Sequence, residues 1–448
     1  MSRSLTPQVA TALDRIARER QRKYRVPGLY AGVARHGKLA WGAGIGAADV
    51  TDLDTPPGPD DQFLIASNTK TFTAVLVLRL RDEGKLSLDD TLDEHLPEIT
   101  HRGLTIRSML AHVSGMQREP VGDVWDTRQC PDREELIAGF NKAERVHKPH
   151  HLFHYSNLAF SVLGELVGRL DGRPWAESLQ ARILDPLEMT RTTVGLRGRS
   201  VTGYFVPPYT DVPIPEAVVE QKALAPCGAL ASTASDLAKW SAFVADPVED
   251  VLSPDTLEEM LQPQILLEPV RWGGAVGLGF MLMRSGDRVF VGHTGGMPGH
   301  ISGLFTDRDS GTGALVLMNN TAAPDPAAFA VELATHAIEN DPEPETAWRP
   351  GSAVPDELAD VVGLWFSEGR PFVVSVREGR LEARAQDQPD HLPAARFRQL
   401  EPDLYRTEVG RERGELLRIT RDAAGRPVMM HWATYLVTRE PLAFGQRP

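Results

Sequence analysis

Residues 63–80 read FLIASNTKTFTAVLVLRL, an apolar run that leads into Ser67-Asn68-Thr69-Lys70 and then into an apolar helix pattern over 71–80. Residues three apart on a helix share one face, so the Lys70 side chain is expected within reach of the Ser67 hydroxyl. A serine hydroxyl is a weak nucleophile unless a neighbouring base accepts its proton, and a lysine serves as such a base in some sites. Taken alone, the tetrad is better explained by a helix-capping serine and a solvated lysine.

Two later motifs reverse that interpretation. Tyr155-Ser156-Asn157 precedes an apolar helix pattern, and Gly292-His293-Thr294-Gly295-Gly296 lies between two strand-like runs at 288–291 and 301–305. The motifs follow one another as Ser-x-x-Lys, then Tyr-x-Asn, then a strand with His-Thr-Gly. This is the order used by the penicillin-recognising serine enzymes.

On these motifs the chain resembles the class C β-lactamases, the D-aminopeptidases and their related esterases. The resemblance extends to the segments at 104–116, 184–189 and 228–237, and covers about residues 5–335. It implies an α/β fold of the β-lactamase/transpeptidase type, in which helices flank an antiparallel sheet and a helical region is inserted. Strand patterns at 28–36, 39–46, 277–283, 288–293, 301–306 and 313–319 and a helix pattern near 326–339 agree with it.

The resemblance also implies roles for the motif residues. Ser67 attacks an acyl carbon and forms an ester intermediate, while Lys70 and Tyr155 share the proton transfers. Which of the two is the base in acylation stays open. Asn157 would orient Lys70 and hold the substrate amide.

The third motif is expected to bind the substrate and its oxyanion. The backbone N–H groups of Ser67 and Gly296 would form the oxyanion hole, in which each donor contributes about 3–4 kcal/mol to the transition state. Thr294 and Gly295 would bind the substrate beside it.

His293 departs from the lysine that β-lactamases and cell-wall peptidases usually carry at this position. Because a histidine is mostly neutral near pH 7, it should attract a substrate carboxylate weakly, so β-lactam hydrolysis is expected to be poor. His293 is instead expected to tune Tyr155 and the leaving group. Relatives with His-Ser/Thr-Gly include D-aminopeptidases, esterases and stand-alone thioesterases of the penicillin-binding-protein type.

Residues 67–73 and 203–209 and the single C-terminal barrel make the chain most similar to those thioesterases. This similarity implies a trans-acting enzyme that releases and head-to-tail cyclises a nonribosomal peptide, ending in a D-residue, from a peptidyl carrier protein. The substrate would then be a peptidyl thioester. A D-stereospecific aminopeptidase or amidase, or a carboxylesterase, acting on small peptides or esters, would use the same residues. A catalytically silent binding protein is disfavoured, since it has no need for Ser67, Lys70 and Tyr155 together.

Composition excludes several other classes of function. The net charge of -13 argues against nucleic acid or an anionic membrane as partner. Cys130 and Cys227 make neither a disulfide framework nor a metal motif. Residues 6–17 read as an amphipathic helix with charges inside it, without the apolar segment of a signal peptide, and no stretch is long enough to span a membrane. A cytoplasmic location is therefore predicted.

Two loops contain residues that invite a functional interpretation. His147, His150, His151 and His154 crowd a Pro-containing loop that offers neither the spacing nor the fixed scaffold of a zinc site, so no metal and no cofactor are predicted. Trp125, in the loop 116–135, either contacts the substrate or packs.

The chain is long enough for a large domain and a smaller one, and we predict a catalytic domain at 1–340, an acidic Pro-rich linker at 341–356 and a second domain at 357–448. Short alternating runs in the last segment predict an antiparallel meander closed into a small barrel. It resembles the lipocalin-like barrel of some D-aminopeptidases, as either a stabilising appendage or a wall of the cleft. Arg439, on its last predicted strand, is a candidate to contact a peptide or else a solvated strand residue.

Overall fold

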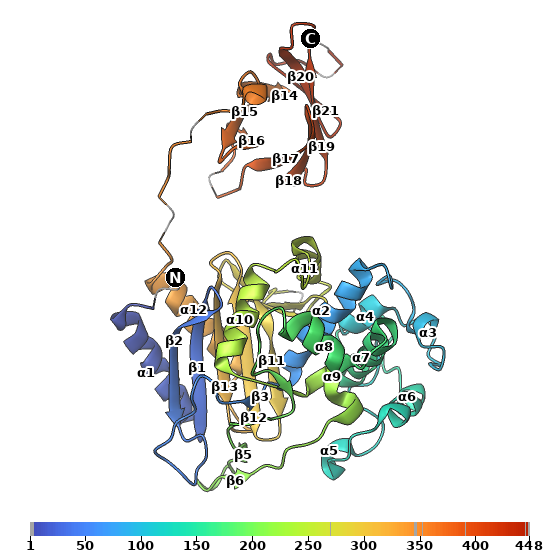
Figure 1. Cartoon of the computed structure of the whole chain (residues 1–448), viewed down its shortest axis with the longest axis vertical. Coiled ribbons are helices and arrows are strands. Elements are labelled where there is room, and N and C mark those ends of the chain that lie inside the picture. The colour runs from blue at the N-terminus through green and yellow to red at the C-terminus, as the bar shows by residue number, and fades with distance from the viewer. Residues whose placement is uncertain are drawn as a thin grey trace. The chain divides into compact units, whose positions relative to one another are not determined.

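The structure is a computed structural model that describes residues 4–268, 270–344, 347–351, 353–389, 391–443 and 445–446. The chain divides into two compact units, residues 1–343 and 344–448 (Figure 1). Three residues of the predicted linker, Glu345, Thr346 and Ser352, lie outside the described residues. Within the described residues, no helix has the length and apolar character needed to cross a membrane.

The first unit is built on an eight-stranded sheet in which every neighbouring pair is antiparallel. The chain's first strand pairs with β13, so the sheet takes strands from both ends of the unit, as the sequence predicts. In spatial order the strands are β2 (Lys38–Gly46), β1 (Gly28–Arg35), β13 (Thr312–Met318), β12 (His300–Asp307), β11 (Arg288–Met297), β10 (Met281–Ser285), β9 (Gly274–Val276) and β8 (Ile265–Leu266).

The two faces of the sheet pack against different helices, because successive strand residues point to opposite sides. On one face, Leu29 and Val33 of β1 join a core with α1 (Pro7–Lys23) and α12 (Pro326–Asn340). On the other face, Tyr30 joins the larger core. That core also contains residues of α10 (Ala234–Ala245), which covers this side of the sheet in Figure 1.

The inserted region supplies a central buried helix, α2 (Thr69–Asp82). Every residue from Thr69 to Leu78 is buried, including the polar residues Thr69, Lys70, Thr71 and Thr73 of its first turns. Beside it lies α7 (Asn157–Asp171), which begins at a capping serine: the Ser156 hydroxyl accepts the N–H of Ala159 at 3.0 Å.

Shorter elements complete the first unit. The helices are α3 (Leu92–His95), α4 (Ile106–Leu110), α5 (Val124–Thr127), α6 (Arg133–Lys142), α8 (Trp175–Leu179), α9 (Ala225–Gly228) and α11 (Pro254–Met260), with a π-helical segment, η2 (Gln180–Leu184), and 3₁₀ turns η1 (Ala66–Asn68) and η3 (Lys222–Leu224). The short strands are β3 (Phe63–Leu64), β4 (Thr193–Val194), β5 (Tyr204–Phe205), β6 (Ile214–Pro215) and β7 (Leu230–Ser232).

The second unit is a closed antiparallel barrel, which confirms the predicted meander. A 3₁₀ turn, η4 (Asp356–Leu358), precedes it, and β14 closes the barrel by pairing with β21 through Phe366 and Thr438. The strands are β14 (Gly363–Ser367), β15 (Arg370–Arg377), β16 (Arg380–Ala385), β17 (Ala395–Glu401), β18 (Leu404–Val409), β19 (Leu416–Arg421), β20 (Pro427–Trp432) and β21 (Tyr435–Thr438).

Arg439 is a correction to the predicted barrel. It follows β21 instead of lying on it, and its guanidinium carbon lies 3.8 Å from the ring centroid of Trp365. Its Nη1 donates to the carbonyl of Leu364 at 3.2 Å. Arg439 is therefore half-buried against Trp365 just after the last strand; a contact with peptide stays a prediction.

Two helical glycines provide a matched test of the packing between α7 and α9. A methyl group on Gly164 would lie 2.0 Å from Pro226 Cγ, whereas one on Gly139 of α6 would meet nothing within 4 Å. We expect Gly164→Ala to lower the free energy of unfolding by about 1–3 kcal/mol through overpacking. Gly139→Ala should raise it by up to about 1 kcal/mol. Urea unfolding measures both, and equal effects would contradict the packing described.

Candidate active site

Ser67 lies in the turn η1, just before α2 begins at Thr69. The turn contains a strained residue, since Ala66 has φ +47°, a conformation uncommon outside glycine. Hydrogen bonds from the sheet hold it. Asn68 Nδ2 donates to Ser302 Oγ on β12 at 2.9 Å, and Ser302 Oγ donates to the carbonyl of Ile65 at 2.9 Å. The sheet thereby fixes the backbone on both sides of Ser67.

Gly295 allows β11 to approach this turn closely. A methyl group at Gly295 would lie 2.1 Å from the carbonyl oxygen of Ile65 and 2.5 Å from Ser302 Oγ. The structure thus gives Gly295 a packing role against the turn. Its neighbours Thr294, predicted to bind the substrate, and Gly296, predicted as an oxyanion-hole donor, both line the cleft with Ser67.

Lys70 is fully buried and contacts three oxygen atoms. Its Nζ lies 3.2 Å from Ser67 Oγ, 2.8 Å from Asn157 Oδ1 and 2.6 Å from the carbonyl oxygen of Cys227. A buried amine needs such partners, because an unpaired polar group costs free energy away from water. The expected contact between Lys70 and Ser67 is present, and Asn157 orients Lys70.

Tyr155 lies in the segment that leads into α7, and His112 supports its ring. The two rings stack with centroids 4.3 Å apart, and Lys70 Nζ lies 4.9 Å from the Tyr155 centroid. His112 Nδ1 accepts the N–H of Ser156 at 3.0 Å, so its proton is on Nε2. That Nε2 is buried and has no hydrogen-bond partner among the described residues.

Asn157 connects Lys70 to a carboxylate that the sequence analysis did not consider. While Asn157 Oδ1 faces Lys70, its Nδ2 donates to Glu119 Oε1 at 2.7 Å. The other carboxylate oxygen, Glu119 Oε2, is buried and has no hydrogen-bond partner in the part of the chain that the structure describes. Glu119 also lines the cleft, and Arg118 Nε lies 3.4 Å from its Oε1, so a carboxylate that contacts both Asn157 and Arg118 forms part of the cleft wall.

The cleft at Ser67 has a volume of about 700 Å³. Its wall is partly aromatic and partly acidic, with the described lining Ser67, Arg118, Glu119, Trp125, Phe153, Tyr155, Asn157, Glu216, Met281, Thr294, Gly296, Met297, Pro298, Ile301 and Thr321. Trp125, on α5, belongs to this wall and is 40% exposed, which fits the predicted contact with substrate better than a packing role.

His293 is buried behind the cleft wall, and its strand neighbours, not His293, are among the described lining residues. Its Nδ1 donates to the carbonyl of Thr294 at 2.5 Å, and its ring centroid lies 6.1 Å from that of Tyr155. Burial, and then the nearby Lys70, lower the pKa of His293 to about 3. The side chain is therefore neutral near pH 7, and its position favours an effect on Tyr155 over contact with a leaving group.

The other flagged residues form no further centre among the described residues. The rings of His147 and His154 lie 5.2 Å apart, but the described chain holds no group of three or more His, Cys, Asp or Glu side chains suited to a metal. Cys130 and Cys227 are both free and buried.

Sequence reasoning missed His112, Glu119, Ser302 and the carbonyl of Cys227. His112 lies inside the segment 104–116 that carries the family resemblance, and Glu119 lies in the loop examined for Trp125. Both could have been flagged as polar residues next to a motif. Ser302 and the Cys227 carbonyl have no signal in the sequence.

Comparisons with known proteins agree with this architecture. Residues 13–337 match the family described as Beta-lactamase, and residues 354–439 match a domain of unknown function, DUF7586. Protein flp of Staphylococcus aureus (strain N315) is 29% identical over 195 residues, which are 42% of this chain and 39% of flp. The match thus spans only about two fifths of that relative.

Solved structures share the fold at low sequence identity. A penicillin-binding protein homologue from Pyrococcus abyssi, described as octameric, has a TM-score of 0.64 and 21% identity, covering 96% of this chain and 99% of its own. A D-stereospecific amidohydrolase from Streptomyces sp. has a TM-score of 0.60 and 24% identity, and the match covers 73% of this chain and 97% of the amidohydrolase. SurE with D-Leu has a TM-score of 0.58 and 23% identity, and the match covers 97% of this chain and 100% of SurE.

The buried histidines predict how stability depends on pH. Burial lowers the pKa of His300 to about 4, below its unfolded value near 6.5. The unfolded chain therefore binds more protons between these values, and the stabilisation present above pH 6.5 is lost as the pH falls toward 4. We expect His300→Gln to flatten this dependence by up to about 1.4 kcal/mol per pH unit. Urea unfolding from pH 4 to 8 measures it; His151→Gln, at an exposed position, is the control. An unchanged slope in His300→Gln would contradict the assignment.

Proposed function

The chain belongs to the beta-lactamase family, and we propose that it is a serine acyl-enzyme hydrolase or acyltransferase that releases and cyclises a peptide with a D-configured C-terminal residue. In this proposal the peptide arrives as a thioester on a peptidyl carrier protein. The observation that carries the proposal is the cleft in which Ser67, Lys70, Tyr155 and Asn157 meet beside the carboxylate of Glu119.

The contacts of Lys70 support a role as the first proton acceptor. Its Nζ lies 3.2 Å from Ser67 Oγ, close enough to exchange a proton with the hydroxyl, and Asn157 Oδ1 and the Cys227 carbonyl hold it there. Ser67 Oγ then attacks the thioester carbon as its proton passes to Lys70 Nζ. The C–S bond breaks, the thiol leaves with that proton, and the peptide is held as an ester.

A cyclase must next let an amine outcompete water at this ester. The peptide's N-terminal amine attacks the ester carbon, an amide bond forms, and Ser67 Oγ regains its proton from that amine. An oriented intramolecular amine reaches effective molarities of about 10⁵ M or more, against about 55 M for water. Glu119 supports this step, because its carboxylate lines the same cleft as Ser67 and can accept a proton from the terminal ammonium group, which leaves a neutral amine to attack.

The preference for a D-residue is supported by the names of two proteins with this fold. One is a D-stereospecific amidohydrolase, and the other, SurE, was solved with D-Leu. The neutral His293 supports a substrate that lacks a free carboxylate at the position where β-lactams carry one.

A D-stereospecific aminopeptidase or amidase is the second candidate. Glu119 favours it as well, since a carboxylate in the cleft wall can bind the α-ammonium group of a D-aminoacyl amide. Purified protein should be offered N-acetylcysteamine thioesters of one peptide ending in either a D- or an L-residue, and D-amino-acid amides. Cyclic product from the D-peptide supports the cyclase. Linear acid alone, with turnover of the amides, supports the second candidate.

Loss of the nucleophile tests the acyl-enzyme itself. We expect Ser67→Ala to abolish both turnover and covalent labelling by a fluorophosphonate. Lys70→Ala and Tyr155→Phe should lose most turnover, about 10²-fold or more, because each removes a group for proton transfer. Circular dichroism checks the fold. Undiminished turnover in folded Ser67→Ala would end this assignment.

Glu119→Gln separates amine binding from the chemistry at Ser67. The glutamine keeps an oxygen for Asn157 but removes the charge. We expect kcat/KM to fall about tenfold or more for thioesters with a free amino group, since hydrogen bonds to charged groups contribute about 1.5–3 kcal/mol. N-acetylated thioesters, which cannot present an ammonium group, should be hydrolysed at an unchanged rate. An equal loss on both substrates would show that Glu119 only positions Asn157.

A further inference from the structure

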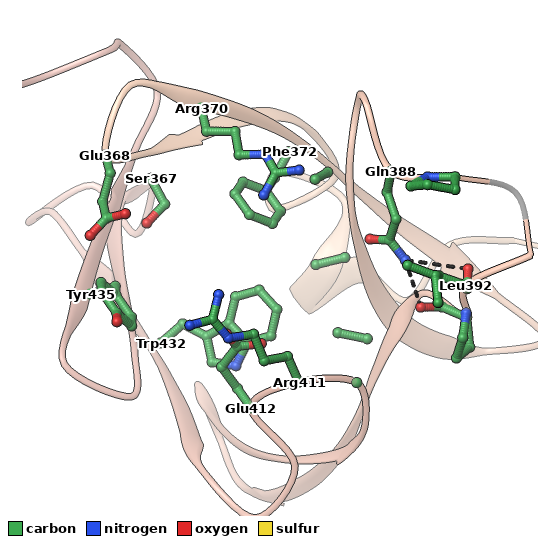
Figure 2. Close-up of a pocket in the computed structure, with 16 residues that line it drawn as sticks. Ser367, Glu368, Arg370, Phe372, Gln388, Leu392, Arg411, Glu412, Trp432 and Tyr435 are labelled. Carbon is green, nitrogen blue, oxygen red and sulfur yellow. Dashed lines mark hydrogen bonds and ion pairs between the residues drawn. The ribbon is translucent and has the colours of Figure 1, made fainter. Parts of the chain in front are cut away.

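One end of the barrel is hollow. Along β16 the inward side chains shrink from Leu381 to Ala383 and Ala385, and Ala395 of β17 adds a third buried alanine. The three alanines line a cavity of about 650 Å³ (Figure 2). Deeper in the barrel, below Phe372 and Trp432, the remaining space is only about 10 Å³.

Such a hollow is unusual in a small barrel. Protein interiors are close-packed, with few voids larger than a water molecule, and eight strands enclose a space that side chains normally fill or that holds one small ligand. The volume lies within the range of about 300–1,000 Å³ that is typical of ligand pockets. We refer to this cavity, lined by the three alanines and by Phe372 and Trp432, as the barrel cup.

Aromatic rings form the inner wall of the barrel cup. Trp432 is fixed by a hydrogen bond from Nε1 to Thr407 Oγ1 at 2.9 Å. The rings of Phe372 and Phe397 meet it nearly edge-on, with centroids 6.0 and 5.2 Å away. A rigid aromatic wall opposite alanines suits an apolar group.

Charged groups stand at the mouth. Figure 2 shows the guanidinium groups of Arg370 and Arg411 entering it from opposite sides. Arg370 Nε and Nη2 both donate to one oxygen of Asp387, at 3.0 and 2.7 Å, while its Nη1 has no hydrogen-bond partner among the described residues. Arg411 is 89% exposed, and its ion pair with Glu412 is long at 3.8 Å. Glu368 lies on the same rim.

From this arrangement we propose that the barrel cup binds a carboxylate carried on an apolar body. The apolar body lies against the aromatic wall and the alanines, and the carboxylate lies between the two guanidinium groups, which are suited to that ion. Glu368, Glu412 and Asp387 place three carboxylates at or beside this mouth, so the guanidinium groups bind the ligand's carboxylate through direct hydrogen bonds and not through a net positive field. A free fatty acid and the C-terminus of a hydrophobic peptide share this chemistry.

The test uses the full chain with Ser67→Ala, so that no probe is consumed. Isothermal titration compares decanoate with decylamine and 1-decanol, and the peptide N-acetyl-Leu-Leu-Phe as its free acid with its C-terminal amide. Decanoate is expected to bind most tightly of the three decyl probes. Binding of the peptide acid over its amide would assign the site to peptide termini, and binding of decanoate alone would assign it to fatty acids.

Matched variants locate the binding. Ala385→Leu fills the cup and should abolish binding, whereas Ala424→Leu, on an exposed turn, should not. Ala383→Leu replaces Ala385→Leu if thermal unfolding shows that the latter is misfolded. Arg411→Gln should weaken decanoate about threefold and Glu368→Gln should tighten it by a similar factor, as expected for rim charges. The proposal would be overturned if Arg411→Gln tightened decanoate and Glu368→Gln weakened it, or if decylamine bound more tightly than decanoate. Full binding by a folded variant with the cup filled would overturn it as well.

Because the nucleophile is absent throughout, this outcome is independent of the chemistry proposed at Ser67. The turnover and labelling assays on the protein with Ser67 intact test that chemistry separately, so failure of one proposal is distinguished from failure of the other.

Discussion

The first unit depends on how it satisfies one buried amine. Lys70 lies on a helix that is buried along almost its whole length, so its nitrogen has no access to bulk water. Its three oxygen partners come from the turn η1, from α7 and from α9. An unsatisfied buried amine would be strongly destabilising, and for that reason these three segments must stay in register with one another. The same contacts place the amine against the Ser67 hydroxyl, so the stability of the helical region and the arrangement of the site share one set of hydrogen bonds.

Close backbone packing joins this helical region to the sheet. Gly295 lets β11 come against the carbonyl of Ile65, and Ser302 bonds to the same carbonyl from β12. Gly164 likewise lets α7 pack closely against α9, the short helix that contains the Cys227 carbonyl. Side chains larger than hydrogen at these positions would separate elements whose alignment sets distances of about 3 Å at the site. Packing here is therefore a condition for chemistry as well as for stability.

The barrel follows a different physical logic. Its deep end is filled by large apolar side chains, whereas its other end is lined by alanines and left open. Filling that space would have been the simpler route to stability, since burial of apolar groups stabilises a fold. The match to a domain of unknown function covers this barrel, and the cup provides a concrete property to measure in it.

Much of this protein was predictable because the relevant information is local in the sequence. The three-residue spacing of Ser67 and Lys70 places them on one face, alternation marks the strands, and the acidic Pro-rich stretch near 341–346 marks where the first unit ends. The order of three motifs then indicates a family and, with it, a fold. What the sequence could not show depends on distant contacts. The acceptor on Cys227 is a backbone carbonyl, which every residue has, so no side-chain pattern marks it. The contact of Glu119 with Asn157, the buried position of His293 and the stacking of Arg439 on Trp365 arise only when segments far apart in the chain meet. Whether a side chain is buried, and which groups it contacts, depends on how these distant segments pack together, so only the tertiary structure decided it.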